Sequence, residues 1–300
     1  MNFLLASASV GEWLDKTFLG FDLGVFAFFG RMGNEFLNVV AKVFTNLGST
    51  KYGILIMVLA LVLILFRKSR KFGMALFFSI LLGLLLTNGI IKPLFLRLRP
   101  YNTLQYLPEY MGWYTNAGML SESDYCFPSG HTTAAFEIAV SMCLCFTAAG
   151  KKKIAWIFPV LAVFTGLSRI YLMVHYATDV IAGMLIGILA GIVGYNISRL
   201  ITSKLSGTEF WTRFDLERII WGKKGKSISK KAAGWAIAIA WMVIFAVTLA
   251  LSFKSGGDNL RCAYDGDYKC YNEVKESDQY LIDGQYYCKI HTKELTQQSN

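Results

Sequence analysis

The sequence contains little charge. Only 17% of its 300 residues are charged and 54% are hydrophobic, whereas a soluble globular domain usually carries about 25% charged residues. Several apolar runs approach or exceed the roughly 20 residues that cross a bilayer as a helix. Because lipid cannot satisfy free backbone polar groups, each such run must be helical. The clearest runs are Tyr52 to Phe66, Phe72 to Ile91, Thr132 to Ala149, Ile154 to Val174, Val180 to Ile197 and Ala232 to Phe253.

No basic residue precedes the first apolar stretch, MNFLLASASVGEW. A secretory signal peptide normally begins with a positively charged segment, so we do not expect this stretch to be cleaved. Residues 1–32 mix aromatic side chains with Glu12, Asp15, Lys16 and Asp22. This mixture predicts an amphipathic segment that lies at the membrane interface.

The net charge of +10 falls mainly in three segments between apolar runs, at 67–71, 151–153 and 199–231. Clusters of Lys and Arg in short loops mark the cytoplasmic side of a membrane protein. With the weakly apolar stretch Asn34 to Leu47 as a first span, they predict seven spans and a cytoplasmic N-terminus. The same placement disfavours nucleic acid as a partner, because the cations lie between membrane helices.

The expected architecture is therefore an all-α, polytopic membrane helix bundle. Its core covers residues 33–200, followed by a basic cytoplasmic linker at 201–231, an additional span at 232–253 and an extracytoplasmic tail at 254–300. The last core run contains the small-residue repeat Gly183, Gly187 and Gly191, which is typical of closely packed helices in lipid.

Histidine is also scarce: the chain has only three, and two of them lie at predicted outer ends of helices. His131 follows Pro128, Ser129 and Gly130, a pattern typical of a helix N-terminus. The free N–H groups of such an end bind anions, and His131 there could donate a proton to a leaving oxygen. The alternative is a capped helix with an incidental interfacial histidine.

His175 has Asp179 four residues further on, one helical turn away if the segment is helical. A carboxylate at that spacing can hold one imidazole nitrogen and leave the other directed at a substrate. Asp179 could instead only cap the following helix, and both roles can coexist.

Two cations, Lys92 and Arg99, stand seven residues apart and so share approximately one helical face, although Pro93 and Pro100 interrupt the helix. Arg offers a bidentate fork to a phosphate and Lys a point charge. Basic residues that snorkel at a helix end are the alternative, and for Arg97, between the two, we expect snorkelling or a headgroup contact.

In this order and on one predicted face, these segments resemble the type 2 phosphatidic acid phosphatase (PAP2) superfamily, which also contains vanadium haloperoxidases and enzymes of the glucose-6-phosphatase type. The family signatures K-x6-RP, PSGH and SR-x5-H-x3-D correspond to Lys92 to Pro100, Pro128 to His131 and Ser168 to Asp179. The resemblance covers Asn34 to Leu200 and implies a six-helix PAP2-type core, here with one extra C-terminal transmembrane helix.

The resemblance also implies the roles of individual residues. His175 would be the nucleophile that forms a phosphohistidine, Asp179 would orient it, and His131 would protonate the leaving group. The phosphoryl oxygens would be held by Lys92, Arg99, Arg169, Ser129 and the Gly130 N–H. No Asp/Glu/His cluster with metal-ligand spacing is present in the sequence, so we expect no metal and no cofactor, activity in EDTA, and inhibition by vanadate.

The tail holds Cys262, Cys270 and Cys288, and Cys126 is predicted on the same side of the membrane. An even number of cysteines in an oxidising compartment predicts two disulfides, one of them tying the tail to the active-site loop. His291 is expected at the tail's surface.

The expected substrate is a membrane lipid phosphate or diphosphate, such as undecaprenyl diphosphate, phosphatidate or phosphatidylglycerophosphate, at the outer face of a bacterial plasma membrane. A phosphatase for a soluble phosphate ester is an alternative enzyme. A non-hydrolytic phosphate or lipid binding or transport protein is a third reading, which the presence of a nucleophile, an acid and an orienting carboxylate disfavours.

Overall fold

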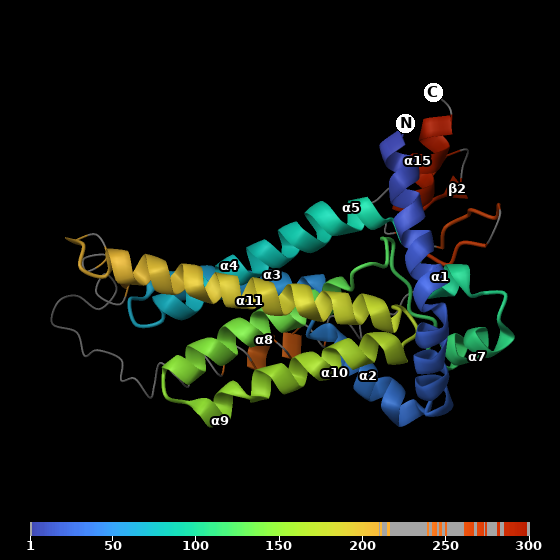
Figure 1. Ribbon diagram of the computed structural model, residues 1–300. Helices are drawn as coiled ribbons and strands as arrows, with labels where there is room; N and C mark the ends of the chain where they lie inside the picture. The colour runs from blue at the N-terminus through green and yellow to red at the C-terminus, as the bar shows by residue number, and fades with distance from the viewer. Residues whose placement is uncertain are drawn as a thin grey trace.

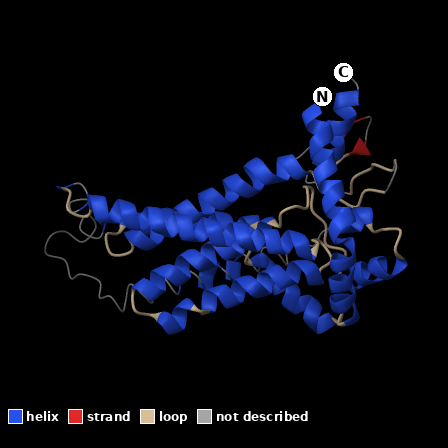
Figure 2. Ribbon diagram, viewed as in Figure 1, coloured by secondary structure: helices blue, strands red, loops and turns tan. Residues whose placement is uncertain are grey.

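The computed structural model describes residues 2–209 and, beyond them, residues 211, 215–216, 239, 242–244, 246–247, 250, 261–266, 269–272, 274, 281–282 and 285–298. The described chain is almost entirely helical (Figures 1 and 2). Its helices are α1 (Asn2–Arg31), α2 (Glu35–Asn46), α3 (Thr50–Leu65), α4 (Arg70–Leu84), the π-helical η1 (Leu85–Ile91), α5 (Lys92–Phe95), α6 (Pro100–Thr103), α7 (Pro108–Asn116), α8 (Gly130–Ala148), α9 (Lys152–Ala155), α10 (Ile157–Tyr171), α11 (Ala177–Leu205) and α15 (Lys289–Gln298). Two short antiparallel strands, β1 (Leu281–Ile282) and β2 (Gln285–Tyr286), form a hairpin in the tail.

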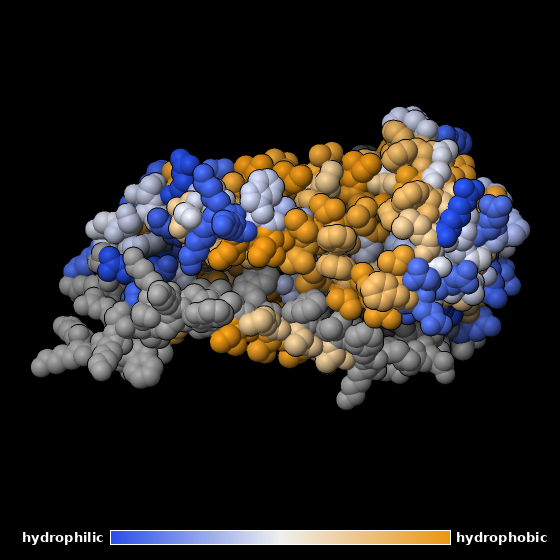
Figure 3. Space-filling model, turned by 90° about the horizontal axis from the view of Figure 1, so that it is seen from below, coloured by the Kyte–Doolittle hydropathy of each residue, from blue (hydrophilic) through white to orange (hydrophobic). Residues whose placement is uncertain are grey.

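Five helical stretches are long and apolar enough to cross a membrane, counted within the described residues: Glu35–Leu65, Arg70–Thr103, Gly130–Ala148, Lys152–Tyr171 and Ala177–Leu205. Their apolar side chains form a hydrophobic band between hydrophilic ends (Figure 3). The predicted all-α polytopic bundle is therefore confirmed. Most of the additional span predicted at 232–253 and most of the linker at 201–231 lie outside the described residues.

The prediction that Asn34 to Leu47 forms a span of its own is wrong, because α2 and α3 together make one pass. The backbone N–H of Asn34, just before α2, donates to the Tyr171 hydroxyl at the end of α10. Near the end of α2, the Phe44 carbonyl accepts from Thr165, which lies further into the bundle along α10. From there α3 continues in the same direction until it packs against the start of α4.

The break between α2 and α3 lies inside the bundle, where unpaired backbone groups are costly. Side chains satisfy these groups. Thr165 of α10 donates to the Phe44 carbonyl at 3.2 Å, and Ser49 donates to the Asn46 carbonyl at 2.8 Å while capping α3 at Tyr52. Two apolar runs that the sequence separates thus behave as one broken helix.

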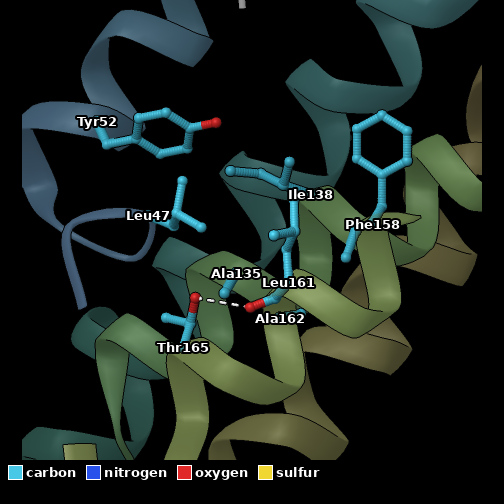
Figure 4. Close-up of a pocket in the computed structure, with 9 residues that line it drawn as sticks. Leu47, Tyr52, Ala135, Ile138, Phe158, Leu161, Ala162 and Thr165 are labelled. Atoms are coloured by element: carbon cyan, nitrogen blue, oxygen red, sulfur yellow. Dashed lines mark hydrogen bonds between the residues drawn. The ribbon is translucent and has the colours of Figure 1, made fainter. Parts of the chain in front are cut away.

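Beside this break, α3, α8 and α10 leave a small pocket (Figure 4). Its lining residues are Leu47, Tyr52, Ala135, Ile138, Ala139, Phe158, Leu161, Ala162 and Thr165. Among these residues, Thr165 donates its hydroxyl to the Leu161 carbonyl at 3.0 Å. Because no cation lines the pocket, it suits hydrocarbon and not phosphate.

The glycine repeat of α11 packs against α8. A Cβ on Gly183 would lie 2.6 Å from the Ser129 carbonyl, and one on Gly187 would lie 2.6 Å from the Thr133 carbonyl. Only glycine allows the two backbones to approach this closely. The repeat therefore holds the start of α8 directly against the start of α11.

Helix α1 crosses one end of the bundle at a steep angle, and α7 and α15 lie at the same end (Figure 1). A side chain of α1 reaches the start of α11 there, since Asp22 accepts hydrogen bonds from Thr178. The seven-span count predicted the N-terminus and the candidate site on opposite faces. This is wrong, because α2 and α3 make a single pass and α1 lies at the same end as the site.

Candidate active site

The polypeptide changes direction just before the first basic signature. The π-helical turn η1 leads into α5, which begins at Lys92, and Leu96 ends α5 in the left-handed conformation with φ 50°. Arg99 then lies in extended backbone. Lys92 and Arg99 therefore do not share a helical face as expected. They converge because the chain bends between them, and both form ion pairs with Asp124.

Two carboxylates lie among the predicted phosphate-binding cations. Glu122 forms ion pairs with Arg99 and Arg169, while Asp124 pairs with Lys92 and Arg99. Both arginines are fully buried. The three cations thus form one anion cradle, and its anionic partners in the structure are the carboxylates of this acidic loop.

The N-terminus of α8 completes the cradle on another side. Ser129 caps the helix, because its hydroxyl accepts from the Thr132 N–H. Gly130 lies beside Lys92, whose Nζ would be 3.8 Å from a Cβ at that position. The Nδ1 atom of His131 lies 3.7 Å from Glu122 Oε1. The PSGH signature therefore brings a helix N-terminus and an imidazole to the same anion site.

His175 lies between Asp179 and the cradle. Its Nδ1 is 3.3 Å from Asp179 Oδ2, and its Nε2 is 2.9 Å from a guanidinium nitrogen of Arg99. A guanidinium can only donate, so Nε2 must accept and Nδ1 carries the proton. The geometry therefore fixes the tautomer in which the unprotonated Nε2 faces the cradle.

The electrostatic surroundings keep this imidazole neutral. Burial and the neighbouring Arg99 lower the pKa of His175 to about 4, although the hydrogen bond to Asp179 opposes the shift. Burial raises the pKa of Glu122, but Arg169 and Arg99 outweigh burial and hold this pKa well below its usual value. At neutral pH the site thus contains a neutral histidine beside cations that are already paired with carboxylates.

Arg97 is a site residue that the sequence analysis misplaced. It is 1% exposed, so the expected snorkelling or headgroup contact is wrong. It donates to Asp179 Oδ1 at 2.6 Å, to Asp15 at 2.7 Å and to Asp22 at 3.2 Å. The turn at Leu96 directs Arg97 away from the cradle, where it anchors the carboxylate that contacts His175.

The predicted disulfides are not formed, since all six cysteines are free thiols. Cys126 is buried beside the imidazole: its Sγ donates to Asp179 Oδ2 at 2.6 Å and lies 3.4 Å from His175 Nδ1. His291, expected at the surface, is fully buried against the tail cysteines.

The structure thus brings every predicted site residue to one end of the bundle. It adds the acidic loop residues Glu122 and Asp124, together with Arg97 and its partners Asp15 and Asp22. The sequence held one signal for them, namely acidic residues in segments otherwise placed at the outer interface, but it did not indicate which cations they meet.

The fold and the site define a polytopic helical membrane protein with a buried anion cradle beside two histidines. The model of the PAP2 superfamily matches residues 72–202. This segment contains all three signatures, and over it the chain is similar to the PAP2 superfamily.

Two relatives are similar to part of the chain. An undecaprenyl-diphosphatase of Sulfolobus acidocaldarius is 34% identical over 145 residues, covering 46% of this chain and 62% of the relative. A lipid A 4'-phosphatase of Porphyromonas gingivalis is 29% identical over 159 residues, covering 51% of this chain and 64% of the relative. The chain thus spans a little under two thirds of the length of these two proteins.

The crystal structure of a transmembrane PAP2-type phosphatidylglycerolphosphate phosphatase from Bacillus subtilis superimposes with a TM-score of 0.52 and 22% identity. The match covers 67% of this chain and 96% of that structure. It shows that the two chains share a fold.

Proposed function

We propose that this protein is a membrane phosphatase that hydrolyses a lipid phosphate or diphosphate through a phosphohistidine at His175, without a catalytic metal. The observation that carries the proposal is the orientation of His175. Its unprotonated Nε2 faces an anion cradle at 2.9 Å from Arg99, while Asp179 holds the other ring nitrogen. A protein that only bound phosphate would not need an oriented nucleophile beside its cations.

In the first step, the Nε2 lone pair of His175 attacks phosphorus and forms an N–P bond as the bond to the leaving oxygen breaks. His131 gives its proton to that oxygen. In the second step, a water molecule attacks phosphorus, loses a proton to His131 and breaks the N–P bond. The products are the dephosphorylated lipid and inorganic phosphate, or a lipid monophosphate and phosphate from a diphosphate.

The cradle supplies what phosphoryl transfer mainly requires, which is positioning and stabilisation of negative charge. Lys92, Arg99 and Arg169 would hold the phosphoryl oxygens, with Ser129 and the Gly130 N–H at the start of α8. Three fixed cations can take the charge-neutralising role that a metal ion has in other phosphatases, so the reaction should proceed in EDTA.

Two features favour a lipid substrate at the outer face of a bacterial plasma membrane. The site lies at the end of the bundle that α1 crosses (Figure 1). The ends of the molecule flank its hydrophobic band (Figure 3), so we place the site at the level of the lipid headgroups. The basic segments 67–71 and 151–153 connect helices at the opposite end, and the positive-inside rule assigns that end to the cytoplasm.

The test is phosphate release in detergent, with and without EDTA, by wild type and His175→Ala. Undecaprenyl diphosphate, phosphatidate, phosphatidylglycerophosphate and a soluble sugar phosphate form the substrate panel. We expect an active wild type, a silent variant and a preference for one lipid. Binding of all four compounds without phosphate release would overturn the proposal in favour of a binding or transport protein, and preference for the sugar phosphate would overturn the lipid assignment.

A further inference from the structure

The tail contains a buried cluster of four groups that commonly bind transition metals. One ligand atom from each of Cys262, Cys270, Cys288 and His291 lies within 4.8 Å of all the others, and all four residues are buried. The sequence analysis missed this cluster because it searched for carboxylate and histidine ligands and assigned the cysteines to disulfides. Three thiols and one imidazole are a donor set of structural zinc sites.

The distances fit a tetrahedral metal better than a disulfide. A Zn–S bond of about 2.3 Å places two sulfur ligands about 3.8 Å apart across a tetrahedron, and the Sγ atoms of Cys270 and Cys288 are 3.9 Å apart. Sulfur atoms in a disulfide are bonded at about 2.05 Å. The Nδ1 atom of His291 lies 3.4 Å from Cys262 Sγ and 3.2 Å from Cys288 Sγ, as expected for neighbouring ligands of one ion.

Surrounding groups match the needs of metal-bound thiolates. The Cys288 N–H donates to Cys262 Sγ at 3.2 Å, and Asn272 donates through its backbone N–H to Cys270 Sγ and through its side chain to Cys288 Sγ. Each cysteine sulfur therefore accepts an N–H, which stabilises negative charge on sulfur. The Tyr264 ring stacks on His291 at 3.9 Å and fixes the imidazole plane.

We propose that Cys262, Cys270, Cys288 and His291 bind one structural zinc ion that folds the tail. The fold of this segment otherwise has little support, since β1 and β2 contain two residues each and its apolar cluster is built around the same three cysteines. A small domain with so small a core usually depends on a metal or disulfides.

The zinc module docks on the segments that build the candidate active site. Arg261 donates to Ser121 Oγ at 2.9 Å and to the Met119 carbonyl at 3.2 Å, just before the acidic loop. Asn102 exchanges hydrogen bonds with Tyr271 and Asn272, just after the basic signature. The metal would therefore hold together a module that restrains both segments.

Zinc content of the full-length protein, purified in detergent without chelators, tests the proposal and does not depend on catalytic activity. We expect about one zinc ion per wild-type chain and almost none in Cys288→Ser and His291→Ala. Cys143→Ser is the matched control, because Cys143 lies in α8 and outside the cluster, and it should retain the metal.

Two measurements on wild type remain decisive if a variant does not fold. Exchange of the bound metal for Co²⁺ should produce the absorption bands of a tetrahedral thiolate site. Alkylation of Cys262, Cys270 and Cys288 should require prior removal of the metal, whereas that of Cys143 should not. A metal-free wild type, equal alkylation of the tail cysteines with and without chelator, or a mapped Cys270–Cys288 disulfide would overturn the proposal.

Discussion

His175 and His291 are buried in similar ways at the same end of the molecule. The two side chains are almost completely inaccessible, and in each case a cysteine Sγ lies 3.4 Å from Nδ1. The residues that complete each cluster differ. Asp179 and Arg99 surround His175, whereas two further thiols and the Tyr264 ring surround His291.

This difference shows that the groups around a His–Cys pair determine its chemistry. Around His175, a carboxylate takes one ring nitrogen and a guanidinium faces the other, so the imidazole is neutral, oriented and directed at an anion site. Around His291, soft donors converge on a common centre, as a metal ion requires. Cys126 is thus a hydrogen-bond donor to Asp179, while Cys262 is a candidate ligand.

The largest expected effect comes from removing the carboxylate that distinguishes the first cluster. Asp179→Asn should lower kcat about a thousandfold with little change in KM, because the amide favours the wrong tautomer of His175. Steady-state kinetics measure this, with Tyr264→Phe beside His291 as the control that keeps full activity. An Asp179→Asn enzyme within about tenfold of wild type would mean that Asp179 does not orient His175.

Arg97 should have the next largest effect, although it does not face the cradle. Arg97→Ala leaves three acidic partners facing one another, so we expect kcat to fall about a hundredfold together with a lower Tm. Arg97→Lys keeps the charge and should recover part of kcat. A raised KM with unchanged kcat in either variant would instead place Arg97 in phosphate binding.

The fold was largely predictable because continuous apolar runs of this length satisfy their backbone groups in lipid as helices. The single pass of α2 and α3 was not, since the side chain that satisfies the break, Thr165, lies more than a hundred residues further along the chain. The candidate site residues were predicted from the resemblance of three signatures to the PAP2 superfamily, because each segment alone left an alternative open. Arg97 was misplaced because the left-handed turn at Leu96 reverses its direction, which no periodicity predicts.

In the tail, the relevant residues were recognised from the sequence but their arrangement was not. Its cysteines were recognised, but counting them together with Cys126 led to disulfides. In the structure the four thiols are free and Cys126 donates to Asp179. The approach of His291 to the tail cysteines is what suggests a metal. Ligand sets that come from a loop, a hairpin and a helix leave no regular spacing in the sequence.

The pH profile of kcat/KM tests whether the surroundings of His175 keep its imidazole neutral, as the comparison with His291 implies. Because burial and Arg99 lower its pKa to about 4, the imidazole stays neutral at every higher pH and becomes protonated only below that value. Activity should therefore fall about tenfold per pH unit below pH 4. Arg99→Gln removes the cation and should move this limb toward the ordinary histidine value of about 6.5. A wild-type limb near 6.5 would contradict this environment.

A smaller effect is expected from the acidic loop in the cradle. Glu122→Gln removes a negative charge that pairs with Arg99 and Arg169, so vanadate and phosphate should inhibit the variant at about fivefold lower concentration. Glu109→Gln, on an exposed position of α7, is the matched control and should behave like wild type. Unchanged inhibition in Glu122→Gln would show that the carboxylate does not compete with the anion.

The smallest effect on turnover should come from the second imidazole. His291→Ala should release the metal and loosen the contacts of Arg261 and Asn102, which restrain the segments on either side of the cradle. We expect KM to rise about threefold while kcat and the acid limb stay unchanged, because no atom of the tail cluster contacts His175 in the described residues. A loss of kcat as large as that of Asp179→Asn would show that the two clusters work as one, and their separation into a catalytic and a structural site would fail.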